Sequence, residues 1–153
     1  MPSPFHRYGP TLFTAFSALL AALPAAAEPK LHIVEMITDA GAKKFEPRSL
    51  AVSVGDTVRF VNVSGNHNTQ SVEGMIPNGV APWLSDIGEE FEVLVTEEGI
   101  FGYICTPHLE NGMVGLFYTE DAAANFIEAE AATATLPDRP WLIFDILLEP
   151  FRS

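Results

Sequence analysis

The sequence predicts an all-β fold, a two-layer sandwich followed by two helices, and three observations support this fold class. From Leu31 onward, short apolar segments are separated by Gly, Pro, Asn and Asp, which is typical of a β-sandwich. Apolar and polar residues alternate within several segments, as in strands with one buried face. After Glu120 the chain becomes rich in alanine and then shows helical periodicity, which predicts helices packed beside the sandwich.

Residues 1–27 have the features of a signal peptide that is cleaved before Glu28. A basic residue precedes an apolar run from Thr11 to Leu23, and small residues follow this run. A membrane anchor is the alternative, but the run is short for a helix that crosses a bilayer. A lipid anchor needs a cysteine at the cleavage point, whereas the single cysteine of the chain is Cys105. We therefore expect an exported protein without an anchor.

Six segments have the length and alternation of strands. Val58 and Phe60 alternate with polar residues in one of them. In another, Phe101, Tyr103 and Cys105 share one face, so both strands are expected to be half-buried. The candidate strands are Leu31 to Ile37, Ser49 to Val54, Thr57 to Val63, Glu90 to Thr96, Phe101 to Cys105 and Val114 to Tyr118, with turns at Gly55-Asp56 and Glu97-Glu98-Gly99.

Two helices are expected after the strands. Asp121 can cap a helix that runs from Ala122 to Ala131, and Asp138 can cap a second helix. The second helix is apolar and is expected to pack on the sandwich; it carries Trp141, Leu142, Phe144, Ile146 and Leu148. The predicted organisation is a signal peptide at 1–27, a sandwich domain at 28–120 and a C-terminal helical extension at 121–153.

The charge of the chain excludes two classes of partner. Eight Lys and Arg residues stand against 20 Asp and Glu residues, so the formal net charge is −12 at pH 7. Nucleic acids and anionic membrane surfaces would repel such a protein. We therefore expect neither nucleic-acid binding nor membrane insertion of the mature chain.

The only cysteine lies close to two other side chains that bind metals. A lone cysteine in an exported protein is inert and buried, paired with another chain, or held by a ligand. His108 and Met113 follow Cys105 on the same loop, and a thioether suits copper but is a poor ligand for zinc, magnesium or calcium. This set predicts a copper site. His67 is the expected second histidine, because it follows the strand 57–63 in a polar loop.

Two residues restrain this loop before any metal binds. Pro107 biases Thr106 towards an extended backbone, and Gly112 allows the chain to turn back towards Met113. Electron transfer benefits from such restraint, because a site of fixed geometry needs little reorganisation between Cu(I) and Cu(II).

An enzymatic role is not expected, and no catalytic residue is assigned. Multicopper oxidases and nitrite reductases need further histidines, whereas the mature chain holds only His32, His67 and His108. A nucleophilic role for Cys105 with His108 is less suitable than metal binding. Copper storage or delivery is the alternative function, and the complete His, Cys, His, Met set argues against it because copper should stay bound in both oxidation states.

These motifs resemble those of the cupredoxins and, within that group, the pseudoazurins. The spacing Cys, two residues, His, four residues, Met is shared by pseudoazurins and plastocyanins. The segment Gly74 to Gly79 reads Gly-Met-Ile-Pro-Asn-Gly and is similar to the GMIPDG segment of pseudoazurins. Phe45-Glu46-Pro47 and Gly55 to Val58 also match, and the resemblance covers roughly Val34 to Tyr118.

The resemblance implies a Greek-key sandwich of about eight strands that binds one type 1 copper ion at one end. The implied ligands are three strong ones and one axial one: His67, Cys105, His108 and Met113. His108 would reach the surface and pass electrons. Asn68 would tie the two ligand loops together through Thr106, and such contacts tune a metal site.

The resemblance also implies a periplasmic monomer that carries single electrons between larger redox proteins, with nitrite reductase as the usual acceptor and a c-type cytochrome as another partner. Pseudoazurins surround the exposed histidine with lysines, but this chain has acidic residues in the corresponding segments: Glu73, Asp86, Glu89, Glu90 and Glu110. Because steering depends on opposite charges, we expect the partner to present a basic docking face.

The sequence also predicts where four further residues lie. Met75 and Ile76 match a family position in the apolar rim beside the exposed histidine. Trp83 belongs either to the same surface or to the core. His32 has no accompanying motif and is expected on the surface of a strand.

Overall fold

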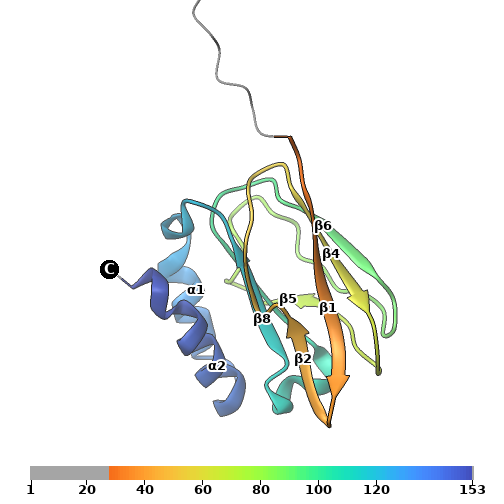
Figure 1. Ribbon diagram of the computed structural model, residues 1–153. Coiled ribbons are helices and arrows are strands. Elements are labelled where there is room, and N and C mark those ends of the chain that lie inside the picture. Colours follow the sequence, from red (N-terminus) through yellow and green to blue (C-terminus); the bar gives the residue numbers. More distant parts are fainter. Residues whose placement is uncertain (1–27, 153) are drawn as a thin grey trace, which may run out of the picture.

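The computed structural model describes residues 28–152, which form two packed β-sheets with helices on one side (Figure 1). The predicted all-β sandwich with eight strands is confirmed. The strands are β1 Leu31–Asp39, β2 Ala42–Glu46, β3 Ser49–Ala51, β4 Thr57–Asn62, β5 Gln70–Ser71, β6 Phe91–Leu94, β7 Ile100–Ile104 and β8 Val114–Tyr118. The helices are α1 Phe126–Thr133 and α2 Asp138–Leu148, with shorter 3₁₀ turns η1 Thr106–Asn111, η2 Ala122–Ala124 and η3 Glu149–Phe151.

The predicted signal peptide lies outside the described residues. Among residues 28–152, no helix is both long enough and apolar enough to cross a membrane.

The order of strands brings distant segments to one end of the sandwich. One sheet has the order β2-β1-β4-β6 and the other β3-β8-β7-β5. Because β1 runs parallel to β4, the loop that follows β4 lies at the same end as the β1–β2 turn. Gln70 of β5 pairs with Ile104 of β7, so the end of β7 reaches that end as well. The candidate ligand loops therefore meet there.

Two hydrophobic cores lie on opposite faces of the second sheet. Phe101 and Tyr103 of β7 point into the core between the sheets, where Phe45 and Phe60 pack edge-on against the Tyr103 ring. Ile100 of β7 instead joins the core beneath the helices. The expectation that β7 is half-buried is therefore wrong, since all five of its residues are buried. The helices cover the face of β7 that alternation in the sequence would assign to solvent (Figure 1).

Asn125 divides the first predicted helix, so the expected helix from 122 to 131 is wrong. Its side-chain Oδ1 accepts a hydrogen bond from Ile100 N–H at 2.7 Å, and its Nδ2 donates one to Ile100 O at 2.9 Å. These bonds hold Asn125 at φ −139°, outside helical geometry, and α1 begins only at the next residue. Neither Asp121 nor Asp138 makes the expected capping bond through its side chain.

The alternation of residues does not predict β2 or β5. Only Phe45 is buried in β2 and only Ser71 in β5, so neither strand has enough buried positions to show a period of two. The first strand runs to Asp39, beyond its predicted end. Conversely, the strand predicted to end at Val54 already ends at Ala51.

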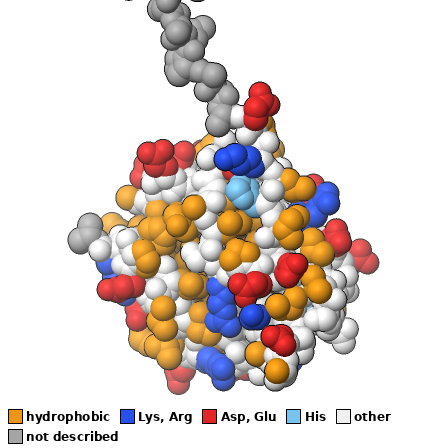
Figure 2. Space-filling view, in the orientation of Figure 1, with side chains coloured by type: hydrophobic (Ala, Val, Ile, Leu, Met, Phe, Trp, Pro, Cys, Tyr) orange, Lys and Arg blue, Asp and Glu red, His pale blue; other side chains and the backbone are white. Residues whose placement is uncertain are grey.

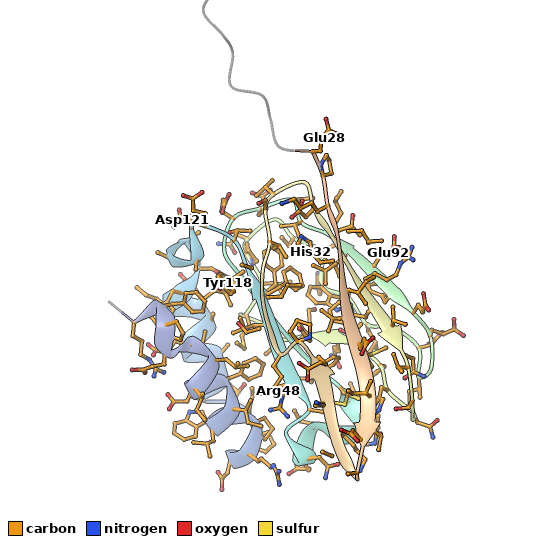
Figure 3. All side chains as sticks on the ribbon, in the orientation of Figure 1. Glu28, His32, Arg48, Glu92, Tyr118 and Asp121 are labelled. Carbon is orange, nitrogen blue, oxygen red and sulfur yellow. The ribbon has the colours of Figure 1, made fainter. Side chains whose placement is uncertain are left out.

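Asp56 closes the end of the sandwich at which Glu28 and His32 lie (Figure 3). The carboxylate accepts hydrogen bonds from Lys30 N–H at 2.8 Å, from Ser53 N–H at 3.0 Å and from His32 Nε2 at 2.8 Å. Burial alone would raise the pKa of Asp56, but these hydrogen bonds outweigh it and lower the pKa to about 2. His32, expected on a strand surface, is thus half-buried and bonded to a carboxylate.

Candidate metal centre

Three potential ligand atoms converge at the end of the sandwich opposite Asp56. His67 Nδ1 lies 3.1 Å from His108 Nδ1, and Cys105 Sγ lies 3.8 Å from the first and 3.4 Å from the second. The point equidistant from the three atoms is about 2 Å from each, which is close to the usual length of a metal–imidazole bond. The geometry therefore has the size of a metal site.

Cys105 and His67 are buried, whereas His108 is half-buried. Figure 1 places this centre at the lower end of the sandwich, where the β1–β2 turn and the loop before β8 come together. An ion held by the three side chains would be enclosed by protein on most sides, with His108 as the ligand closest to solvent.

Thr38 fixes the orientation of the His67 ring. Its hydroxyl lies 3.0 Å from His67 Nε2, and a ring that donates from Nε2 keeps a free electron pair on Nδ1, the atom that faces Cys105 and His108. Gly65 permits this contact, because a Cβ at its position would lie 2.7 Å from Thr38 Oγ1 and 2.8 Å from His67 Nε2. No sequence signal identifies Thr38, since its role depends on the pairing of β1 with β4.

Asn68 links the two ligand loops, as the resemblance to pseudoazurins implies. Its side-chain Oδ1 accepts hydrogen bonds from Thr106 N–H at 2.9 Å and from Thr106 Oγ1 at 3.1 Å. Its Nδ2 donates to Ser85 O at 3.4 Å, which anchors the same side chain to the segment before β6. The loop that carries His67 and the loop that carries Cys105 are therefore joined beneath the centre.

Backbone hydrogen bonds hold the second loop closed around Met113. Cys105 N–H donates to Met113 O at 2.9 Å, His108 N–H to Cys105 O at 3.1 Å, and Met113 N–H to His108 O at 3.2 Å. Met113 is fully buried in the same core cluster as Cys105. The structure thus brings all four predicted ligand residues to one place.

Burial shifts the pKa values of all three groups in the direction that favours their neutral forms. Burial raises the pKa of Cys105, although hydrogen bonds from the N–H groups of Asn68 and His108 oppose this effect. Burial also lowers the pKa of His67 and of His108, and the positive charge of Lys43 contributes to both shifts. Both imidazoles are therefore poised to present electron pairs rather than protons.

The donor set fits copper. Among the described residues, the cluster that could hold a metal consists of two histidines and one cysteine, without a carboxylate, and its potential ligand atoms lie within 4.8 Å of one another. Imidazole and thiolate suit copper, and a weak axial thioether completes the arrangement of a blue-copper site. The two imidazole electron pairs at 3.1 Å would repel each other unless a cation or proton lies between them.

The structure places the other residues of interest as follows. Met75 is fully buried in the core beneath the helices, so its expected place in an exposed rim is wrong. Its side chain packs over Gly102, where a Cβ would lie 2.7 Å from Met75 Cε. Trp83 belongs to the core between the sheets and stacks on Phe117. Of the two alternatives for Trp83, the core is correct.

Comparison with known proteins identifies the same kind of protein. Residues 32–120 match the family model described as copper binding proteins, plastocyanin/azurin family. The chain is 37% identical over 127 residues to a pseudoazurin of Paracoccus pantotrophus, covering 82% of this chain and 86% of the relative. It is 35% identical over 119 residues to a putative pseudoazurin of Rhizobium leguminosarum bv. viciae, covering 78% of each.

The fold agrees with a solved structure of the same kind. The crystal structure of pseudoazurin from Methylobacterium extorquens AM1 superposes with a TM-score of 0.73 at 26% identity, covering 80% of this chain and 99% of that chain. This superposition covers more of the chain than the residues that the family model matches.

Proposed function

The chain belongs to the plastocyanin/azurin family of copper-binding proteins, as a cupredoxin of the pseudoazurin type, and on that premise we propose that it is a periplasmic carrier of single electrons. The proposed ligands of its one type 1 copper ion are His67, Cys105, His108 and Met113. One observation carries the proposal: two imidazole nitrogens and a thiol sulfur converge at 3.1 to 3.8 Å in a buried cluster without a carboxylate.

Bound copper supplies one-electron chemistry by alternating between Cu(I) and Cu(II). The chain's own contribution is to keep the ligands in place. Thr38 orients His67, and Asn68 joins the two ligand loops, so neither loop is free to rearrange when the charge of the centre changes. His108 is the half-buried member of the set and offers the shortest route for an electron to the surface.

Copper storage or delivery is the competing function, and two features argue against it. A delivery site must release its metal readily, whereas His67 and Cys105 are buried and are held by hydrogen bonds from separate elements. A thiolate and a thioether also favour Cu(I), and two imidazoles suit Cu(II), so the set retains copper in both states.

Direct voltammetry of the copper-loaded protein tests the carrier function. We expect a reversible one-electron wave that persists over many cycles, with one copper per chain measured before and after. Loss of copper on reduction, or its transfer to a weak Cu(I) chelator during cycling, would support storage or delivery instead.

We propose that residues 1–27 are a signal peptide and that the mature protein begins at Glu28. The basic residue followed by an apolar run and small residues supports this proposal. Expression of the full chain in a bacterium, osmotic release of the periplasm and mass measurement provide the test. A cytoplasmic protein that retains residues 1–27 would contradict it.

We propose that the redox partner, such as a nitrite reductase or a c-type cytochrome, presents a basic face to this protein. Gly88 N–H bonds to His67 O at 2.8 Å, which places the acidic segment from Asp86 to Glu90 beside a ligand loop, and Glu110 is exposed on η1 next to His108. Opposite charges accelerate association, and added salt screens them. Transfer to a basic partner should therefore slow as salt is added, whereas acceleration by salt would mean that like charges meet.

A further inference from the structure

Helix α2 contacts the ligand loop at Gly112, the residue just before Met113. A Cβ built on Gly112 would overlap Ile143 Cδ1 and would lie 3.2 Å from Arg139 Cγ and 3.3 Å from Arg139 Nε. Gly112 has φ +75°, a left-handed conformation that glycine adopts without strain. Two side chains of α2 therefore cover a backbone position that only glycine can fill.

Gly112 lies within the hydrogen bonds that shape the metal centre. Its N–H bonds to Leu109 O at 2.8 Å, and the adjacent Met113 bonds to His108 O and accepts a bond from Cys105 N–H. A displacement of Gly112 would thus move the backbone of two proposed ligands together. The contact with α2 acts where the loop turns back towards the centre.

The helix is itself held firmly against the sandwich. Pro140, Phe144 and Leu148 recur on one face of α2 and are buried, and Phe144 and Leu148 lie in the core beneath the helices. At the other end, Arg152 forms salt bridges with Asp145, Glu149 and Glu130, the last of which belongs to α1.

The outer face of α2 carries exposed apolar residues, and hydrophobic side chains gather on this side of the molecule (Figure 2). The atoms nearest to a Cβ built on Gly112 belong to Ile143 and Arg139 instead. Among the exposed apolar residues, Ile146 is 63% exposed and provides a site for a control substitution on the same helix.

We propose that Ile143 and Arg139 are positioning residues for the copper centre. By packing on Gly112 they keep the ligand loop closed and so fix the placement of Met113 and His108. Helix α2 then helps to position the copper ligands, and it also covers the outer face of the second sheet. This inference rests on the proposed function, since it concerns the same ligands.

The test compares Ile143→Ala with Leu148→Ala, which removes a buried side chain more than one turn further along the same helix. Both variants should lower the melting temperature. Only Ile143→Ala should shift the reduction potential and change the visible and electron paramagnetic resonance spectra of the copper-loaded protein. Ile143→Leu should retain the reduction potential and the spectra of the wild type, and Ile146→Ala should leave them unchanged.

A second measurement uses the metal-free protein. Amide hydrogen exchange at Met113 should rise by about tenfold or more in Ile143→Ala and in Arg139→Ala, because local opening of the loop costs less. Arg139→Met, which keeps the alkyl part that contacts Gly112, should exchange as slowly as the wild type. Equal exchange in all variants would overturn the inference.

The outcomes also separate this inference from the proposed function. If the wild type forms a blue copper protein and Ile143→Ala has the same spectrum and potential, the inference is wrong and the function stands. If Leu148→Ala shifts the potential as much as Ile143→Ala does, the effect is one of general stability and the positioning role is wrong. If the wild type itself binds no copper, the proposed function fails while the exchange measurement still reports on the contact between helix and loop.

Discussion

Each end of the sandwich carries a histidine, half-buried His32 at one end and buried His67 at the other, and the groups that face the two rings differ. At one end, His32 meets Oδ2 of Asp56 at 2.8 Å, the backbone N–H of Ser53 donates to the same oxygen, and that of Lys30 donates to Oδ1. At the other end, His67 Nδ1 faces the corresponding nitrogen of His108 and the sulfur of Cys105, and no carboxylate belongs to that cluster. The first arrangement is complete within the protein, whereas the second needs a cation or a proton between its electron pairs.

This difference shows how a structural histidine is distinguished from a metal ligand. Both rings are held by a hydrogen bond from one side, His32 by Asp56 and His67 by Thr38. The ring nitrogen on the other side distinguishes the two functions. A nitrogen that faces other metal-binding atoms carries an electron pair and no proton, and this electron pair is available to a metal ion. Burial and a hydrogen-bond partner alone would not separate the two cases.

Removal of a histidine from each end should give the largest contrast. His67→Ala should weaken Cu(II) binding by at least about 100-fold, since loss of a ligand costs more than loss of a supporting contact. His32→Ala should leave copper affinity within about twofold, because its ring lies at the opposite end of the sandwich. Competition with a chelator of known affinity measures both constants, and similar losses in the two variants would break the comparison.

Replacement of the carboxylate should affect stability and leave the copper centre intact. Asp56→Ala leaves two backbone N–H groups and the His32 ring without their acceptor, which should lower the free energy of unfolding by about 2 to 3 kcal/mol. Urea unfolding of the metal-free protein measures this loss. The visible spectrum of the copper-loaded variant should match the wild type, and a changed spectrum would show that the two ends are coupled.

The pH dependence of stability should carry a signature of Asp56. Its pKa falls from 3.8 in a free side chain to about 2 in the fold, so the ionised form is stabilised by folding. The contribution is therefore present above pH 4 and is lost as the pH falls from about 4 to about 2, amounting to about 2 kcal/mol. Asp56→Asn should flatten the acid limb of a plot of unfolding free energy against pH. An unchanged limb would mean that other carboxyl groups dominate.

Lys43 should provide the smallest effect, at the metal end. Burial is the main cause that lowers the pKa of His108, and the charge of Lys43 adds to it, so this cation acts on the centre. A nearby positive charge favours the reduced, less positive ion, and Lys43→Gln should lower the reduction potential by roughly tens of millivolts.

Lys44→Gln is the matched control for Lys43→Gln. Lys44 forms a salt bridge with Glu46 at 2.8 Å, so its charge is already paired. Voltammetry should show a smaller shift for this variant, and the Lys43 effect should shrink at high salt. Equal shifts in the two variants would mean that the effect depends only on net charge.

The parts of the site that lie close together in sequence could be predicted. Cys105, His108 and Met113 lie on one loop, and their chemistry alone indicates copper. Asn68 adjoins His67, and the resemblance to pseudoazurins correctly implied its contact with Thr106. The all-β sandwich followed from alternation and turn residues in the same way.

The remaining parts depend on tertiary contacts that no local pattern reports. Thr38 reaches His67 only because β1 runs parallel to β4, and Ile143 reaches Gly112 only because α2 folds back on the ligand loop. Asn125 interrupts a helix for a bond to Ile100, a residue of a different element. The same cause explains Met75, whose burial depends on the helices that cover it.

The visible spectrum after addition of Cu(II) to the mature chain, recorded beside that of Cys105→Ser, tests the central claim most directly. A thiolate bound to Cu(II) gives an intense blue charge-transfer band, which a serine hydroxyl cannot produce. We predict this band at one copper per chain in the wild type and its complete loss in the variant. A colourless wild-type protein, or a band that survives in Cys105→Ser, would contradict the assignment of Cys105 as a copper ligand.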